Sequence, residues 1–456
     1  MTLPVLRDDA LRTTDAGFTV LVNLPWIRSL PIESLHEVVV EIDGAAVPVD
    51  VVATAPWWHV QDRVAITGDR MLPPGPHDVS VSFRLAIPYL PAGPDGPLVL
   101  PFGARRTLVA DAPGPAPAAE ATERVAPGAT TTSSEPGWTL AASAFNWTPE
   151  VIGGDVAADV IAADVVRQGV ADTIEIEAGQ VWRSFPTPDD AEVDALRDRL
   201  DEAGGRVSIL GASIDDWAPG GARRTDDERL DFLVPQLRAA ARLGALGVRV
   251  PLGQAGPDLL RRLQPVLHDL GITLFEEAQG HQTSDAAASA FDDIAALDDP
   301  RIRLLIDISM LMPALPVTYL ERLRAGGLPE QFVRLLETEW RDPATQVAVM
   351  ELLRSGGVPG PVHTLFMDMV VRFGRSDAAD LRAVLPLVRG IHLKFWDLDD
   401  TDGRISRPIR EIGTELRTAG FAGTLCSEWG GHEWLDDDPT AMTRAHLELA
   451  AEALAR

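Results

Sequence analysis

The chain of 456 residues has one cysteine, almost no lysine and no long apolar run. A single cysteine, Cys426, excludes internal disulfides and a zinc site built from several cysteines, and it suits a reducing compartment. The N-terminal residues lack the apolar core of a signal peptide, so we expect a soluble, cytoplasmic protein that does not bind membranes. The formal net charge of −28 argues against nucleic acid or an anionic membrane as a partner.

Lysine is the rarest charged residue. Among 40 basic residues, Lys394 is the only lysine. Phe395 follows it where a Walker A loop requires Ser or Thr, which excludes that phosphate-binding loop. We find neither the GxSxG elbow of serine hydrolases nor a well-placed GxGxxG loop. A single ammonium group in an arginine-rich chain draws attention to its position.

The length predicts two domains. In residues 1–111, turn signals separate short β-branched or alternating runs, a pattern typical of a small all-β sandwich. Trp57, Trp58 and His59 fit a core or interface patch better than a catalytic site. Residues 112–136 are rich in Pro, Ala, Ser and Thr and predict a linker. The strand-like runs are FTVLVNL (18–24), HEVVVEI (36–42) and HDVSVSFRLAI (77–87).

Residues 137–456 alternate apolar strand-like runs with amphipathic helical stretches, which predicts a (β/α)8 TIM barrel. The gap 310–387 is too long for a βα connection, and we expect an insertion that forms helices over the barrel mouth. The predicted strands are 138–145, 173–179, 206–213, 246–253, 272–280, 301–309, 388–396 and 423–431.

Four polar residues end the last four predicted strands. Active sites of such barrels form at the carboxyl ends of the strands. The alternation of each strand directs Glu277, Asp307, His392 and Glu428 inward, with Glu276 the weaker candidate on its strand. Three carboxylates and one imidazole suit a divalent cation, with Mn²⁺ first and Mg²⁺, Co²⁺ or Zn²⁺ as alternatives. Each carboxylate taken alone could instead cap a helix or form a salt bridge.

Other polar residues near the strand ends are candidates for substrate contact. Lys394 shares an inward face with His392 and could hold a substrate oxygen or an enolate as a point charge, although a surface lysine is the alternative. Arg249 could bind substrate. Glu177 could support the site or be structural.

A further set of titratable residues receives a structural interpretation. We expect Asp215 and Asp216 to cap a helix. His268 and His446 lie in predicted helices, and we interpret them as surface or interface residues. Cys426 shares the parity of Glu428 and should be a buried barrel residue rather than a nucleophile.

The ordered Glu/Asp/His/Glu set resembles the sugar isomerases and epimerases of the xylose isomerase-like superfamily. Two longer runs, IHLKFWDLD (391–399) and SEWGGHEW (427–434), are closer to the catalytic subunit of bacterial C-glycoside deglycosidases. Residues 1–103 resemble the small β-sandwich subunit of the same enzymes, including VNLPWIRSLPIESLHEVVVEIDG and LPPGPHDVSV. Both subunits would here be fused in one chain.

The resemblance implies a reaction on glycosides that carry a ketone at sugar C3, typically with Mn²⁺. A base removes the acidic C2 proton, the enolate is stabilised, and the aglycone leaves from C1 by β-elimination, which makes the enzyme a carbon–carbon lyase. The substrate would be a 3-keto-glycoside, C-linked or O-linked, with an aromatic aglycone. We also expect a homo-oligomer.

The family pattern places a histidine two residues after the fifth-strand glutamate. That position is Gln279 here, which cannot act as a base, so His281 and His432 become the candidates. Trp396 and Trp434 would contact the sugar or its aglycone. Gly430 and Gly431 would let the backbone turn close to the substrate.

Several other functions compete with this interpretation. A metal-dependent sugar isomerase or epimerase would use the same metal on free ketoses but would not need the sandwich. A Schiff-base aldolase at Lys394 is disfavoured, because neighbouring carboxylates keep the amine protonated. A non-catalytic carbohydrate-binding or regulatory subunit is a further alternative. An endonuclease conflicts with the strong negative charge.

Overall fold

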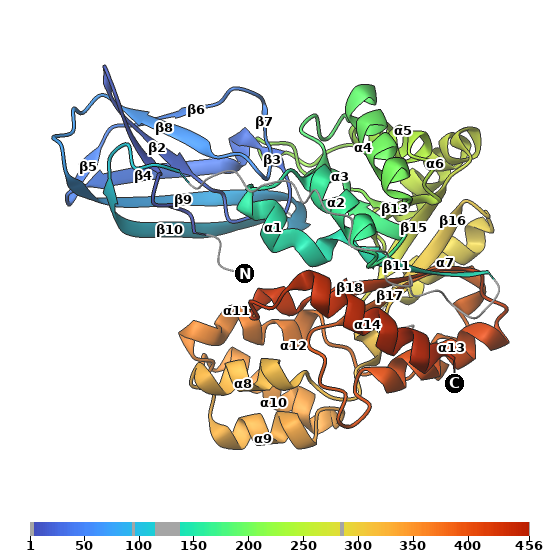
Figure 1. The fold of residues 1–456 in the computed structure, drawn as a ribbon. Helices are drawn as coiled ribbons and strands as arrows, with labels where there is room; N and C mark the ends of the chain where they lie inside the picture. The colour runs from blue at the N-terminus through green and yellow to red at the C-terminus, as the bar shows by residue number, and fades with distance from the viewer. Residues whose placement is uncertain (1–3, 94–95, 115–136, 283–286, 456) are drawn as a thin grey trace.

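The computed structural model describes residues 4–93, 96–114, 137–282 and 287–455. Figure 1 shows a set of strands at the N-terminus (blue) beside a larger body of strands and helices (green to red). The predicted linker 112–136 lies outside the described residues from 115 onward. Within the described ranges, no helix combines the length and the apolar character that a membrane crossing requires.

The N-terminal strands form two four-stranded antiparallel sheets, in the orders β1-β2-β8-β6 and β10-β9-β4-β5, plus the short pair β3-β7. Alternate residues such as Val20, Val22, Val79 and Val81 are buried in a shared core, as the predicted sandwich requires. The sequence pattern did not predict β10, an edge strand that contains Pro and Gly. The bounds are β1 (Leu11–Thr14), β2 (Gly17–Val22), β3 (Leu30–Pro31), β4 (Leu35–Ile42), β5 (Ala45–Val47), β6 (Asp50–Val52), β7 (Trp57–Trp58), β8 (Val64–Gly68), β9 (Pro76–Pro91) and β10 (Pro97–Val109).

Strands β11 to β18 pair in parallel and close into a barrel, which confirms the predicted (β/α)8 fold. The strands end before the predicted limits, because the residues that follow turn away at once into loops, caps or short helices. The bounds are β11 (Trp138–Ser143), β12 (Thr173–Glu177), β13 (Arg206–Gly211), β14 (Gly247–Pro251), β15 (Thr273–Ala278), β16 (Ile302–Asp307), β17 (Val388–Phe395) and β18 (Gly423–Trp429).

The segment between β16 and β17 is helical and builds a core of its own around Tyr319, Phe366 and Phe373. These helices appear in orange in Figure 1. The bounds are α8 (Val317–Ala325), α9 (Glu330–Thr338), α10 (Pro343–Arg354), α11 (His363–Phe366) and α12 (Asp368–Val371). The other helices are α1 (Thr148–Gly153), α2 (Ala158–Arg167), α3 (Ala178–Val181), α4 (Asp190–Ala203), α5 (Asp226–Arg242), α6 (Gly256–Leu270), α7 (Ala288–Leu297), α13 (Ser406–Thr418) and α14 (Pro439–Leu454).

The barrel interior has an apolar layer and a polar layer. Ile209, Phe275 and Leu305 form a small apolar cluster that is separate from the main core. Glu277 and Asp307 follow Phe275 and Leu305 by two residues on the same strands, so they share the inward face one step nearer the carboxyl ends. The apolar cluster therefore forms a floor beneath the polar residues.

Two expectations for individual residues are wrong. Asp215 and Asp216 do not cap the following helix, because Thr225 is the N-cap of α5. Asp215 instead forms a fully buried ion pair with Arg28 of the sandwich. His446 is buried rather than at the surface: it stacks on Phe395 with ring centroids 3.8 Å apart.

Candidate metal centre

The last four strands bring Glu277, Asp307, His392 and Glu428 to one point. One ligand atom from each of the four lies within 4.8 Å of the others, and all four side chains are buried. Asp307 and His392 are register partners on β16 and β17. Their role as metal ligands stays a prediction, but the structure brings together the four residues that strand parity selected.

His392 lies at the centre of this group. Its Nδ1 is 2.6 Å from Oε2 of Glu428 and 2.8 Å from Oε1 of Glu277. Neither contact has hydrogen-bond geometry, and Nδ1 and Oε2 of Glu428 have no hydrogen-bond partner in the part of the chain that the structure describes. Such crowding of a ring nitrogen and carboxylate oxygens favours a cation among them. Burial alone would lower the pKa of His392, but Glu428, Glu175 and Glu277 outweigh it and raise the pKa well above its usual value.

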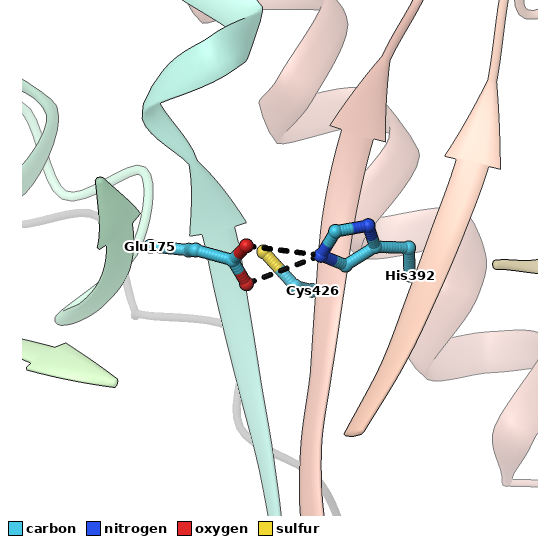
Figure 2. Close-up of side chains that lie close together, drawn as sticks. All are labelled: Glu175, His392 and Cys426. Carbon is cyan, nitrogen blue, oxygen red and sulfur yellow. Dashed lines mark hydrogen bonds and ion pairs between the residues drawn. The ribbon is translucent and has the colours of Figure 1, made fainter. Parts of the chain in front are cut away.

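The other ring nitrogen of His392, Nε2, contacts Glu175, which the sequence pattern did not single out. Both oxygens of Glu175 lie 3.1 Å from Nε2 of His392, and Cys426 lies beside them (Figure 2). A proton on Nε2 that is shared with Glu175 leaves Nδ1 as a donor atom toward a metal. The alternation of TIEIE gives Glu175 the inward parity of Glu177, and this was the signal available in the sequence.

Arg249 on β14 compensates several of the acids. Its Nε lies 2.7 Å from Glu175 and its Nη1 lies 2.8 Å from Glu277, while Nη2 pairs with Glu177. All three guanidinium nitrogens therefore contact carboxylates. Burial raises the pKa of Glu177 to about 7, although the positive charge of Arg249 acts to lower it. Contact of Arg249 or Glu177 with a substrate stays a prediction.

The charges around the centre do not balance without a further cation. With His392 protonated, three cations (Arg249, Lys394 and His392) face five carboxylates, those of Glu175, Glu177, Glu277, Asp307 and Glu428. Burial and the neighbouring acids raise the pKa of Asp307 to about 6, as expected where positive charge is lacking. The donor set and the charge deficit both fit a divalent cation.

Lys394 lies directly beside the proposed ligands. Its Nζ is 3.2 Å from Oε1 of Glu428 and 5.1 Å from the ring centroid of Phe145. Burial opposes the charged form, but Glu428 and Asp307 outweigh it, so the pKa of Lys394 is raised and the amine stays protonated. It can therefore act as a positive charge and not as a nucleophile.

The three candidates for proton transfer lie in different surroundings. Gln279 is exposed. The Nε2 atom of His281 lies 3.1 Å from the carbonyl of Met369 in α12, so this ring is tied to the helical insertion. His432 is buried, and its ring packs 5.1 Å from that of Phe145, the residue that also neighbours Lys394.

His432 has the properties of a neutral imidazole. Burial lowers its pKa to about 4, so the ring carries no charge at neutral pH. Within the described residues, neither ring nitrogen has a hydrogen-bond partner. A role of His432 in proton transfer stays a prediction.

The two tryptophans and the two glycines pack more tightly than predicted. Trp396 lies against Phe373 of the insertion, with ring centroids 4.8 Å apart, and Nε1 of Trp434 donates to Thr318 over 3.0 Å. A Cβ on Gly431 would lie 1.8 Å from the carbonyl oxygen of Trp396, and one on Gly430 would lie 2.7 Å from its Nε1. The lack of a Cβ at these two glycines therefore leaves room for Trp396. Close approach of their backbone to a substrate stays a prediction.

A pocket opens beside Lys394 and Trp396. Its walls include Met312, Pro316 and Ile405. The lining combines two cations, Lys394 and Arg404, with the carboxylate of Asp397, the indole of Trp396 and aliphatic side chains. Substrate contact by Trp396 stays a prediction, and Trp434 is not among the residues that line this pocket.

The chain is similar to two different kinds of known protein, one over most of its length and one over a smaller part. A C-glycoside deglycosidase alpha subunit from Arthrobacter globiformis is 27% identical over 300 residues, which cover 63% of this chain and 84% of the relative. A C-glycoside deglycosidase beta subunit from the same organism is 28% identical over 106 residues, or 19% of this chain and 79% of the relative. No known protein-family profile matches the chain.

Solved structures resemble the barrel more distantly. The 3-keto-D-glucoside 4-epimerase of E. coli is 14% identical with a TM-score of 0.37, over 63% of this chain and 93% of that one. A xylose isomerase domain protein from Alicyclobacillus acidocaldarius is 16% identical with a TM-score of 0.41, over 70% of this chain and 98% of that one.

Proposed function

We propose that this protein is a divalent-metal-dependent deglycosidase that cleaves 3-keto-glycosides by β-elimination. The observation that carries the proposal is the buried group of Glu277, Asp307, His392 and Glu428, with Lys394 at its edge. The similarity to alpha and beta subunits named C-glycoside deglycosidase supports the choice of substrate. The domains would be a sandwich over 1–111, a linker over 112–136 and a barrel over 137–456 that carries the 310–387 insertion.

The four ligands would hold Mn²⁺ first, with Mg²⁺, Co²⁺ and Zn²⁺ as alternatives. When bound, the cation would supply Lewis-acid polarisation of the sugar carbonyl. Glu175 holds the imidazole of His392 in the orientation that a ligand needs, and Arg249 keeps Glu277 charged. Glu175 and Arg249 would thus support the proposed ligands His392 and Glu277 without binding the metal themselves.

The chain's own residues would carry the remaining chemistry. A base takes the C2 proton, whose acidity comes from the C3 ketone, and Lys394 stabilises the negative charge that develops on the oxygen. The electron pair then forms the C1–C2 double bond while the bond from C1 to the aglycone breaks. The aglycone leaves with the bonding pair and takes up a proton. No water is added to the sugar, so the reaction is that of a lyase.

His432 is the base that the geometry favours. It is neutral, buried and close to Phe145 and Lys394, whereas His281 is bonded to the insertion. Gln279 would bind rather than transfer protons. A sugar isomerase or epimerase is the second candidate, because the same group of ligands could act on free ketoses without releasing an aglycone.

The deciding experiment incubates the Mn²⁺-loaded protein with 3-keto C-glycosides and 3-keto O-glycosides and follows free aglycone. We expect release of aglycone that disappears after chelation of the metal. Interconversion of free ketoses with no aglycone release would replace the deglycosidase with the isomerase. We expect a homo-oligomer in the cytoplasm, which sedimentation and cell fractionation would test.

A further inference from the structure

The sandwich contacts the barrel at the turn that follows β12. Both the backbone N–H and the hydroxyl of Ser29 donate to the carbonyl of Gly179 over 2.8 Å. The side-chain amide of Gln180 donates to the carbonyl of Ile27 over 2.8 Å. Gly179 lies two residues beyond Glu177, so three consecutive residues of the sandwich fix the turn next to an acid of the candidate site.

Arg28 joins the same turn to the neighbouring loop. Its Nη2 lies 2.6 Å from Oδ1 of Asp215, and both side chains are buried. Its guanidinium lies 4.0 Å from the ring centroid of Tyr89. A Cβ on Gly179 would lie 3.0 Å from Cβ and 3.1 Å from Cδ of Arg28, so the arginine stem lies against the glycine. The loops after β12 and β13 are therefore held by one residue of the sandwich.

Glu177 links this junction to the proposed metal ligands. It is the N-cap residue of α3, and its carboxylate covers Gly211 so closely that a Cβ there would lie 2.1 Å from Oε2. The same carboxylate pairs with Arg249, whose Nη1 lies 2.8 Å from Glu277. Each step from Ser29 to Glu277 is a direct contact or a span of two backbone residues, and the groups involved are buried or partly buried.

We propose that Arg28 and Ser29 of the sandwich are positioning residues for the metal centre, acting through Gly179, Glu177 and Arg249. This inference rests on the proposed metal site and adds a task for the sandwich within it. Loss of these contacts would let the turn after β12 move. Arg249 would then hold Glu277 less firmly, and the site would bind metal more weakly without losing any ligand.

Two variants and one control test the inference in the full chain. Ser29→Ala removes the hydroxyl that donates to the carbonyl of Gly179 and accepts from the backbone N–H of Val60. Arg28→Met combined with Asp215→Leu replaces the buried ion pair by apolar groups, which avoids a lone buried charge. Gln61→Leu is the control, because Gln61 also crosses the junction, with three hydrogen bonds to 151–158 after β11, far from Glu177 in the sequence.

The readouts are Mn²⁺ affinity by titration and amide hydrogen exchange of the metal-free protein. We expect the Arg28/Asp215 variant to bind Mn²⁺ about tenfold more weakly and to exchange faster in peptides that span 173–182. Saturating Mn²⁺ should restore its turnover, as a misfolded protein could not. If the Arg28/Asp215 variant shows the same hydrogen exchange and the same Mn²⁺ affinity as Gln61→Leu, the inference is wrong. If the wild type binds no Mn²⁺, the proposed function fails, and the exchange result alone decides whether the sandwich holds this turn.

Discussion

The ammonium group of Lys394 lies 3.2 Å from Oε1 of Glu428, and the two residues are register partners on β17 and β18. The only lysine of the chain is thus paired with a proposed metal ligand. A substrate oxygen that approaches the ammonium group would also approach the metal. Binding of the ketone and stabilisation of its developing charge are therefore expected at the same place.

Substitution of Lys394 should separate catalysis from metal binding. We expect Lys394→Met to retain Mn²⁺ and to lower kcat by about 10²–10³, because a charge that stabilises the transition state is lost. Lys394→Arg should recover part of the rate, since it keeps the charge in a different geometry. Metal content and steady-state kinetics check this. If Lys394→Met loses Mn²⁺, the lysine supports the metal ligands rather than the transition state.

Neighbouring glutamates on β15 offer a matched pair of variants. Glu277 faces the cluster, whereas Glu276 accepts a hydrogen bond from the backbone of Gly253 over 3.0 Å. We expect Glu277→Gln to weaken Mn²⁺ binding by more than about 100-fold, beyond the effect of most outer contacts. Glu276→Gln should leave the affinity unchanged. Titration calorimetry of both proteins decides, and equal affinities would exclude Glu277 as a ligand.

The other two carboxylate ligands permit the same test. Asp307→Asn and Glu428→Gln should lose metal and activity together, because each removes a charged oxygen donor from the group. Elemental analysis after desalting measures the bound metal. Full metal content in either variant would mean that the ligand set is wrong.

Glu175 should tune the metal site without being a ligand. Glu175→Gln keeps the shape of the side chain but removes the charge that accepts from Nε2 of His392. We expect Mn²⁺ affinity to fall by about 10–100-fold. Since Cys426 lies beside both residues, Cys426→Ala is a suitable control and should change the affinity little. A larger loss of Mn²⁺ affinity in Cys426→Ala than in Glu175→Gln would identify the thiol as the important neighbour of His392.

His432 should carry the proton transfer. His432→Asn is expected to lower kcat/KM by about 10²–10⁴ while Mn²⁺ remains bound. His281→Asn makes the same chemical change in the other candidate and should have a small effect. The pKa of His432 is about 4, so its neutral form predominates above that pH and kcat/KM should fall as the pH drops through about 4. A large loss in His281→Asn alone would reassign the base.

The buried, neutral His446 should make the stability of the fold sensitive to acid. Burial lowers its pKa to about 3, so the folded protein keeps it neutral, while the unfolded chain binds a proton below the usual value of 6.5. Stability from this group is present above about pH 6.5 and is lost as the pH falls toward 3. The slope is about 1.4 kcal/mol per pH unit.

A comparison with His446→Gln isolates this contribution. We expect the difference in free energy of unfolding between wild type and variant to shrink as the pH falls from 6 to 4, as measured by denaturant titration. A constant difference across this range would show that His446 titrates alike in both states.

The alternation of strands and helices was enough to predict the barrel, and strand parity then selected the four residues that meet in it. Alternation fixes which face a side chain takes, and the closed order of the strands then places Glu277 and Glu428 near each other. Glu175 was missed because a glutamate within a strand resembles an ordinary polar position. Its importance depends on the ring of His392, more than 200 residues away in sequence.

Packing between distant segments explains the wrong expectations. His446 looked like a surface residue because α14 alone does not reveal that Phe395 covers it. Asp215 looked like a helix cap because no local signal points to Arg28 in another domain. The contact of Gly430 and Gly431 with Trp396 was not predicted, because it is a tertiary feature. Local patterns predict elements, whereas burial of polar groups depends on partners that the pattern does not contain.

The junction at Arg28 and Ser29 forms within one chain, which makes its occupancy independent of dilution. A tethered domain meets its partner surface at an effective concentration of about 1 mM. A junction with an intrinsic dissociation constant of about 10 µM would then be docked about 99% of the time. Two separate subunits with the same contact would come apart at nanomolar concentrations. Covalent attachment thus fixes the one-to-one ratio of sandwich and barrel and permits a modest contact to hold the turn beside Glu177 in every molecule.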